Sequence, residues 1–148
     1  MAGTVLLADK LSSLHESLAA ALIERGLDVL HADNQEKALG LAERVDIILL
    51  DRELTGNGAL DVIELLRGRP RTCQTPIVVH TSRTDPDYEQ RARLAGAQDV
   101  MQRPFDYDRL LNRIIELGAH PEQEDQPGGV RPGHVEEPDV VRFLGALL

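Results

Sequence analysis

The sequence predicts an α/β fold in which a doubly wound, five-stranded parallel sheet carries helices on both faces. Short apolar runs alternate with segments whose apolar residues recur at helical spacing, and this alternation repeats five times within residues 4–117. Strands that alternate with helices at such regular spacing pair in parallel. The run at residues 45–51 contains five apolar residues and ends in Asp51, as expected of a strand buried on both faces of a sheet.

Each expected strand is followed by an expected helix. The strands are predicted at residues 4–8, 27–31, 45–50, 77–80 and 98–101. The helices are predicted near residues 12–25, 34–42, 60–67, 85–96 and 106–117. Four of the helices begin at residues that commonly cap helix N-termini, namely Ser12 or Ser13, Asn34, Asp85 and Asp106. Gly26 and Gly96 are expected to end the first and the fourth helix.

The composition predicts a cytoplasmic protein with an aliphatic core. Aromatic residues make up 3% of the chain, so Leu, Ile, Val and Ala must fill the core. The net charge of −9 argues against binding to nucleic acid or to an anionic membrane surface. No apolar run approaches the roughly 20 residues of a membrane span, and the first residues lack the features of a signal peptide. The single cysteine, Cys73, excludes an internal disulfide, which fits a reducing cytosol.

The composition changes after Gly118. We expect residues 1–118 to form the globular domain and residues 119–137, rich in Pro, Gly and Glu, to form an acidic linker. Residues 138–148 are apolar again and are a candidate partner-binding tail, with an apolar face of Val140, Val141, Leu144, Leu147 and Leu148. A helix this short is unstable alone in water, so the tail is expected either to dock or to remain disordered.

Polar residues follow the expected strands at their C-terminal ends, where open parallel sheets hold their functional sites. They are Asp9 and Lys10 after the first strand, Asp51 after the third, Thr81 after the fourth, and Arg103-Pro104 after the fifth. These residues and their spacing resemble those of the receiver domains of two-component response regulators. The resemblance covers residues 4–117.

The resemblance implies a flavodoxin-like (βα)5 sheet with the strand order 2-1-3-4-5. It implies that Asp51 accepts a phosphoryl group from a histidine kinase, that the Thr81 hydroxyl binds this group, and that the base at position 103 pairs with it. It also implies Mg²⁺ held by Asp9 and Asp51, a cis peptide before Pro104, and no enzymatic activity beyond self-phosphorylation. The partners would be a histidine kinase or another signalling protein, with homodimers formed through the last helices.

Three positions depart from the family pattern. Lys10 stands where the family usually has its second acid, Arg103 replaces the usual lysine, and Val100 replaces the usual aromatic switch residue. At ~4 Å and an effective dielectric of about 20, one pair of unit charges is worth roughly 4 kcal/mol before desolvation. We therefore expect Lys10 to pair with Asp51 and to weaken or prevent Mg²⁺ binding.

Two functions remain open from the sequence. In the first, the chain is a single-domain receiver that carries a phosphoryl group on Asp51. In the second, it is a phosphorylation-independent adaptor in which Lys10 replaces the metal. Both act through protein–protein contact, because no output domain fits in the 30 residues after Gly118. The five histidines show no metal-ligand spacing and are expected to be solvated or satisfied by hydrogen bonds.

Overall fold

The computed structural model describes residues 2–10, 12–54 and 58–121, and five strands form its sheet. They are β1 (Thr4–Ala8), β2 (Asp28–Ala32), β3 (Ile47–Asp51), β4 (Ile77–Thr81) and β5 (Asp99–Gln102). Every neighbouring pair is parallel, and the order across the sheet is β2-β1-β3-β4-β5. The fold class and the strand order expected from the sequence are therefore confirmed.

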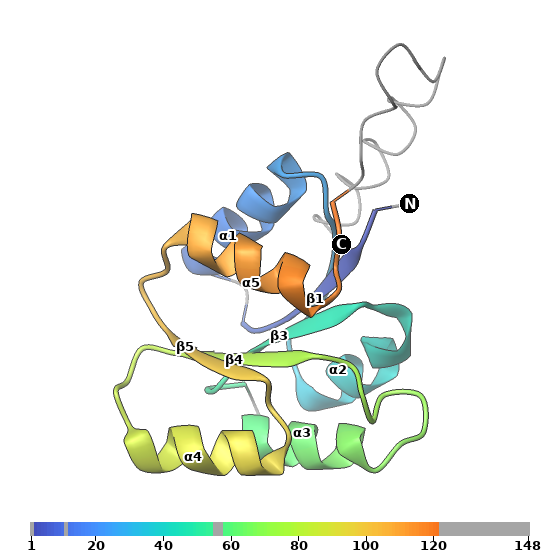
Figure 1. The fold of residues 1–148 in the computed structure, drawn as a ribbon, viewed down its shortest axis with the longest axis vertical. Coiled ribbons are helices and arrows are strands. Elements are labelled where there is room, and N and C mark those ends of the chain that lie inside the picture. The colour runs from blue at the N-terminus through green and yellow to red at the C-terminus, as the bar shows by residue number, and fades with distance from the viewer. Residues whose placement is uncertain (1, 11, 55–57, 122–148) are drawn as a thin grey trace.

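Helices follow the strands, as the alternating pattern predicts. They are α1 (Ser13–Glu24), α2 (Gln35–Leu41) with the 3₁₀ turn η1 (Ala42–Arg44), α3 (Ala59–Arg67), α4 (Pro86–Ala95) and α5 (Tyr107–Leu117). In Figure 1, α1 and α5 lie on one face of the sheet, and α2, α3 and α4 lie on the other. Right-handed crossovers between parallel strands produce this double winding.

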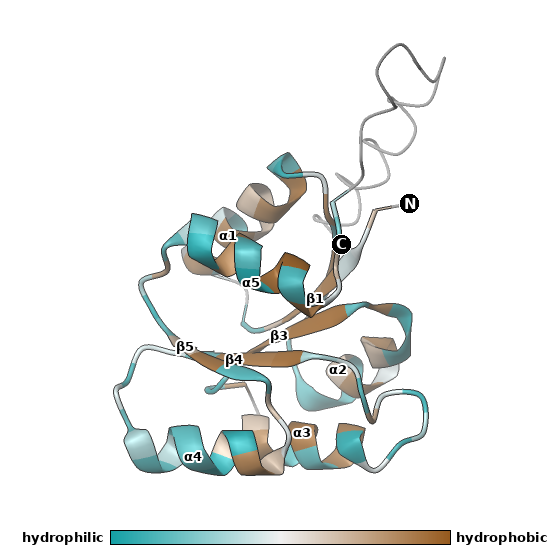
Figure 2. Ribbon diagram, viewed as in Figure 1, coloured by the Kyte–Doolittle hydropathy of each residue, from teal (hydrophilic) through white to brown (hydrophobic). Residues whose placement is uncertain are grey.

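The sheet separates two apolar cores, because successive residues of a strand point to opposite faces. On β1, Leu6 packs into the core under α2, α3 and α4, whereas Leu7 packs into the core under α1 and α5. All five residues of β3 and of β4 are buried, and Figure 2 shows these central strands as the most apolar part of the sheet. The C-terminal ends of these two strands are therefore held in place by the packing of the core.

The third strand begins two residues later than predicted and includes Asp51 as its last residue. Asp46 lies outside the ladder because it forms a separate link to the start of β1. Its N–H donates to the Thr4 carbonyl oxygen at 2.9 Å, and its Oδ2 accepts from the Thr4 N–H at 2.7 Å. The carboxylate of Asp51 is thus positioned by the strand itself rather than by a following loop.

Capping residues fix the helix ends as predicted. Ser12, Asn34, Asp85 and Asp106 are the N-caps of α1, α2, α4 and α5, and each side chain accepts an N–H of its first turn. Gly96 ends α4 with φ of 126°, and a Cβ at this position would lie 2.7 Å from Nε of Arg67. Only glycine fits both this backbone conformation and this close approach.

Contacts with the domain continue past Gly118. Ala119 is fully buried, and the Gly3 N–H donates to the carbonyl oxygen of His120 at 2.7 Å. The predicted linker beyond residue 121 and the predicted tail at residues 138–148 lie outside the described residues. Within the described part of the chain, no helix has the length and apolar character needed to cross a membrane.

Candidate functional site

The polar residues predicted at the strand ends lie at one edge of the sheet. Asp51 and Thr81 are the last residues of β3 and β4, which are neighbours. Asp9 directly follows β1 on the other side of β3, and Arg103 directly follows β5 on the other side of β4. The strand order therefore brings together four residues that are far apart in the sequence.

Asp51 lies at the centre of this edge and is 8% exposed. Its Oδ1 accepts a hydrogen bond from the Glu53 N–H at 2.8 Å. Its Oδ2 lies 3.4 Å from Nη1 of Arg103, which makes a long ion pair. Asp51 thus presents a carboxylate at the sheet edge with a counter-charge beside it.

Thr81 and Arg103 are linked through their backbones. The Arg103 N–H donates to the Thr81 carbonyl oxygen at 2.7 Å, and the peptide between Arg103 and Pro104 is cis, as the resemblance implies. The Thr81 hydroxyl oxygen accepts from the Arg83 N–H at 3.1 Å. Since this bond uses a lone pair, the hydroxyl proton of Thr81 stays available for another acceptor.

The predicted ion pair between Lys10 and Asp51 is wrong. Lys10 is exposed, no salt bridge joins it to an acid among the described residues, and the cation beside Asp51 is Arg103. The physical reason is hydration: an ammonium ion holds water more strongly than a guanidinium does, so burying Arg103 costs less than burying Lys10.

His80 is a buried member of the site that the sequence analysis did not single out. It pairs with Asp51 in the β3–β4 register, and its Nδ1 lies 3.3 Å from Nη1 of Arg103. Its ring packs edge-on against Phe105, with ring centroids 5.4 Å apart. Burial, aided by the Arg103 charge and opposed by Asp51, lowers the pKa of His80 to about 4, so the ring is neutral at pH 7. Nε2 of His80 is buried and has no hydrogen-bond partner among the described residues.

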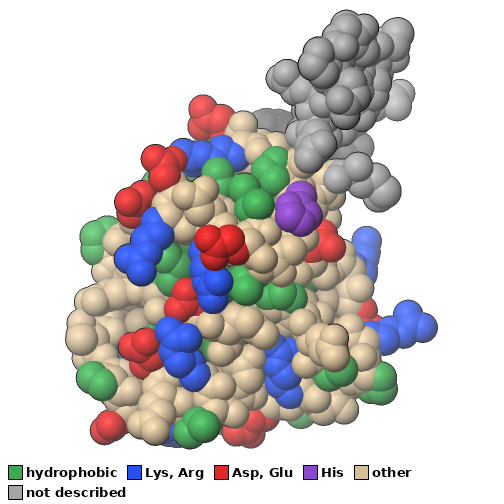
Figure 3. Space-filling view, in the orientation of Figure 1, with side chains coloured by type: hydrophobic (Ala, Val, Ile, Leu, Met, Phe, Trp, Pro, Cys, Tyr) green, Lys and Arg blue, Asp and Glu red, His purple; other side chains and the backbone are tan. Residues whose placement is uncertain are grey.

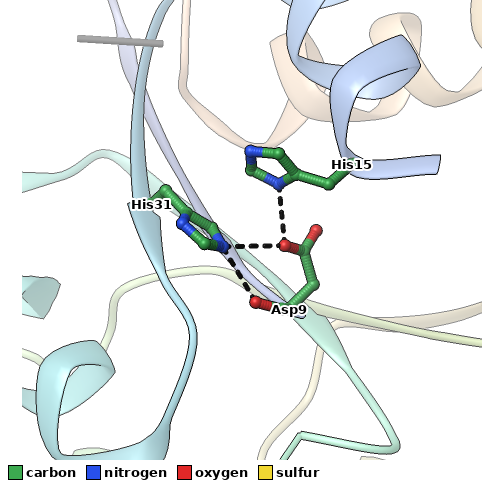
Figure 4. Close-up of side chains that lie close together, drawn as sticks. All are labelled: Asp9, His15 and His31. Atoms are coloured by element: carbon green, nitrogen blue, oxygen red, sulfur yellow. Dashed lines mark hydrogen bonds and ion pairs between the residues drawn. The ribbon is translucent and has the colours of Figure 1, made fainter. Parts of the chain in front are cut away.

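Two further histidines converge on Asp9, as Figure 4 shows. Nδ1 of His15 lies 2.7 Å and Nε2 of His31 lies 3.1 Å from the same oxygen, Oδ1 of Asp9. Nε2 of His31 also lies 2.8 Å from the Asp9 carbonyl oxygen. Burial lowers the pKa of His31, but the contacts with Asp9 outweigh it and leave that pKa above its ordinary value.

Metal-ligand spacing within short segments of the sequence does not reveal this cluster, because its three residues lie in three separate elements or at their ends. The useful signal is topological. His31 lies on β2 opposite Leu7 of β1, and Leu7 precedes Asp9 by two residues, so His31 lies beside the strand that Asp9 follows. His15 lies in the first turn of α1, the helix that follows the same strand. The three residues can be placed together only when β1 and β2 are known to be neighbours in the sheet.

The residues present do not fit Mg²⁺ in the way that the resemblance implies. Mg²⁺ requires hard oxygen donors in a nearly ideal octahedron. Lys10 stands where one acid is expected, Oδ1 of Asp9 is engaged by two histidines, and Oδ2 of Asp51 faces Arg103. The cation that this site places beside Asp51 is therefore Arg103 rather than a metal ion.

The fold and the polar strand ends are those of an α/β signalling domain. The model of the response regulator receiver domain family matches residues 5–115, which is most of the chain. The chain therefore belongs to the response regulator receiver domain family, and it is a receiver domain of two-component signalling.

Curated relatives support this assignment. The phosphate regulon transcriptional regulatory protein PhoB of Pseudomonas aeruginosa is 28% identical over 113 residues, which cover 75% of this chain and 49% of PhoB. The transcriptional regulatory protein KdpE of Mycobacterium tuberculosis is 32% identical over 112 residues, which cover 74% of this chain and 48% of KdpE. The sensor histidine kinase AruS of Pseudomonas aeruginosa is 35% identical over 114 residues, which cover 72% of this chain and 11% of AruS. The chain thus spans about half or less of the length of these relatives.

Solved structures share the fold. The chemotaxis protein CheY4 of Vibrio cholerae superposes with a TM-score of 0.73 at 24% identity, covering 79% of this chain and 99% of CheY4. The receiver domain of a signal transduction histidine kinase from Syntrophus aciditrophicus superposes with a TM-score of 0.71 at 24% identity, covering 78% of this chain and 89% of that domain.

Proposed function

We propose that this receiver accepts a phosphoryl group on Asp51 from a histidine kinase and passes the signal on through protein–protein contact. The observation that carries the proposal is the position of Oδ2 of Asp51 at a strand end, 3.4 Å from Arg103. This distance exceeds the roughly 2.7–2.9 Å of a tight charge-assisted hydrogen bond, so Oδ2 is not locked in a short ion pair. The match to a sensor histidine kinase such as AruS supports a kinase as the phosphoryl donor.

The transfer is a displacement at phosphorus. Oδ2 of Asp51 attacks the phosphoryl group of a kinase phosphohistidine, so that a P–O bond forms while the P–N bond breaks. The electron pair of the broken bond returns to the imidazole nitrogen, and the ring leaves as neutral imidazole when its other nitrogen carries a proton. The guanidinium of Arg103 and the hydroxyl proton of Thr81 stabilise the charge on the transferred oxygens.

Phosphorylation of the whole chain by acetyl phosphate, followed by intact mass spectrometry, tests this proposal. We expect one phosphoryl group on the wild type, released by hydroxylamine as acyl phosphates are, and none on the Asp51→Asn variant. Asp87→Asn, which removes an exposed carboxylate from the first turn of α4, is the matched control and should behave as the wild type. The yield should be the same with Mg²⁺ and with a chelator. An unmodified wild type, or modification that survives Asp51→Asn, would contradict the proposal.

A phosphorylation-independent adaptor is the second candidate function. It is favoured by Asp9, whose carboxylate oxygen is already engaged by His15 and His31 and is therefore unlike a free metal ligand. In this candidate Arg103, rather than Lys10, supplies the fixed cation beside Asp51. Acetyl phosphate and beryllofluoride would then leave the NMR spectrum unchanged, and partner binding would be equal for the wild type and Asp51→Asn.

In either case, a partner would respond to the surface of α4, β5 and α5, or to the tail at residues 138–148, which lies outside the described residues. Figure 3 shows acidic and basic side chains interspersed over the face of the domain seen in Figure 1. Charges of the last elements are paired with one another: Asp99 of β5 accepts hydrogen bonds from Arg93 of α4 and Arg113 of α5. Val100 of β5 replaces the usual aromatic residue, so we expect signalling without a Thr-to-aromatic rearrangement. The predicted linker, residues 119–137, would act as a linker only beyond Ala119 and His120, which pack on the domain, and homodimers would use the surface of the last helices.

A further inference from the structure

The buried cluster of Asp9, His15 and His31 has the composition of a transition-metal site (Figure 4). Oδ1 of Asp9, Nδ1 of His15 and Nε2 of His31 all lie within 4.8 Å of one another. We propose that this cluster binds one divalent transition-metal ion, with Zn²⁺ as the reference ion, through two imidazole nitrogens and one carboxylate oxygen.

The two contacts with Asp9 are somewhat shorter than a bound metal requires, and the two ring nitrogens lie within 4.8 Å of each other. The ring nitrogens of His15 and His31 lie 2.7 Å and 3.1 Å from Oδ1 of Asp9. In a tetrahedral zinc site with bonds of about 2.0–2.2 Å, neighbouring ligand atoms are roughly 3.3–3.5 Å apart. The contacts to Asp9 therefore need to open by less than about 1 Å, which small side-chain rotations provide.

The three ligands are held by rigid parts of the fold. Asp9 directly follows β1, His31 lies on the neighbouring strand β2, and His15 lies in the first turn of α1. Ser12 fixes that turn, because its Oγ accepts the His15 N–H at 3.3 Å. Asp9 and His15 are 4% and 3% exposed, and the side chain of His31 is 8% exposed. A site held in place before binding loses little conformational entropy when the metal enters.

The donor set selects against Mg²⁺ and in favour of softer ions. Imidazole nitrogen suits Zn²⁺, Cu²⁺ and Ni²⁺, whereas Mg²⁺ prefers carboxylate oxygen and water. Three protein ligands leave one position of a tetrahedral ion for water. The inference does not rest on phosphorylation of Asp51, because Asp51 is not a member of the cluster.

The contacts in Figure 4 have one competing explanation. Both imidazole rings could donate an N–H group to Asp9, so that the three residues form a hydrogen-bonded cluster that binds no metal. Calorimetric titration of the full chain with Zn²⁺ separates the two. We expect one equivalent of Zn²⁺ to bind the wild type, and Mg²⁺ at the same concentration to give no heat. Because loss of even an outer partner of a bound metal costs roughly 10–100-fold in affinity, His15→Gln and His31→Gln should each weaken binding by about 100-fold or more.

His120→Gln is the matched control, because His120 is exposed and remote from the cluster in the described chain. It should bind Zn²⁺ as the wild type does. NMR of the wild-type histidine rings gives a second measurement that requires no variant to fold: Zn²⁺ should shift the ring signals of His15 and His31 together and leave that of His80 in place. Absence of Zn²⁺ binding, or equal binding by the wild type and both cluster variants, would overturn the proposal, as would ring signals of His15 and His31 that do not shift.

Discussion

Arg103 contacts both Asp51 and His80 through a single nitrogen. Its Nη1 lies 3.4 Å from Oδ2 of Asp51 and 3.3 Å from Nδ1 of His80. A neutral His80 can accept a hydrogen bond from the guanidinium, whereas a protonated His80 would place two positive charges in contact. The charge state of His80 therefore affects how Arg103 is held beside the candidate phosphoacceptor.

Protonation of His80 gives the first prediction at this scale, a loss of stability in acid. The pKa of His80 is about 4 in the folded protein, below the 6.5 of an unperturbed histidine, so the unfolded chain takes up the proton first. The contribution of His80 is thus fully present above pH 6.5 and is lost as the pH falls toward 4. Between pH 7.5 and pH 5 the free energy of unfolding should fall by roughly 2 kcal/mol through this group.

Urea unfolding at a series of pH values measures this effect. His80→Gln removes the titrating group and should flatten the decline between pH 6.5 and pH 4, whatever its effect on absolute stability. His120→Gln removes an exposed histidine and should leave the decline unchanged. An identical pH dependence in the wild type and His80→Gln would show that His80 titrates normally.

Lys10 gives the second prediction at the residue scale. Since Lys10 is exposed and unpaired with Asp51, its effect on cations must act through water at the site edge. Lys10→Asp changes the local charge by two units. At about 1 kcal/mol per unit pair at 4 Å in water, its interaction with the doubly charged Mg²⁺ ion changes by about 4 kcal/mol, so Mg²⁺ binding should strengthen by up to about a thousandfold. A Mg²⁺ titration followed by NMR measures this change. Lys37→Asp makes the same change of charge on α2 and should leave Mg²⁺ affinity nearly unaltered.

Among the connections between elements, the end of α3 shows how one side chain joins three segments. Arg67 donates to the carbonyl oxygens of Thr72, Thr75 and Gly96, each at 2.8 Å. These oxygens belong to the loop before β4 and to the turn between α4 and β5. Because β4 and β5 carry Thr81 and Arg103 to the site, this guanidinium supports the site from the opposite end of the strands.

We therefore predict that Arg67→Ala destabilises the domain by about 2 kcal/mol, since three carbonyl groups lose a charged donor in a half-buried place. Chemical denaturation measures the loss. Arg69→Ala is the matched control: Arg69 is exposed and donates one bond, to the Leu39 carbonyl oxygen, so its removal should cost less than about 0.5 kcal/mol. Equal effects of the two substitutions would mean that the bonds of Arg67 add nothing beyond ordinary surface contacts.

For the molecule as a whole, the sequence was sufficient for the architecture and for placing four of the polar residues at one edge of the sheet, but not for the three histidines beside them. Alternating apolar patterns predicted five strands and five helices, and the strand ends identified Asp9, Asp51, Thr81 and Arg103 as neighbours. These predictions succeed because strand alternation and helix capping depend on residues close together in the chain.

The hydrogen-bond and ion-pair partners of the side chains were less predictable, because they depend on which charged groups are buried when the chain folds. The prediction that Lys10 pairs with Asp51 was wrong, and Arg103 lies beside Asp51 instead. The sequence pattern does not show that a guanidinium costs less free energy to bury than an ammonium group does. The contacts of His15 and His31 with Asp9 require the relative placement of β1, β2 and α1. Both cases concern long-range geometry rather than local propensity.

The end of the domain gives a prediction for the whole molecule. Ala119 is fully buried and is the last residue in the core under α1 and α5, and the Gly3 N–H donates to the His120 carbonyl oxygen. A chain ending at residue 121 should therefore unfold at nearly the same temperature as the full chain. A chain ending at residue 118 loses the buried methyl group and that hydrogen bond, and it should be less stable by about 1–3 kcal/mol.

Differential scanning calorimetry of the three chains measures these changes, and far-UV circular dichroism verifies that each one folds. The comparison also tests the tail, because residues 138–148 are absent from both shortened chains. If the chain ending at residue 121 melted well below the full chain, residues 122–148 would contribute to the stability of the domain itself. If it melted at the same temperature, the apolar residues of the tail would be free to bind a partner.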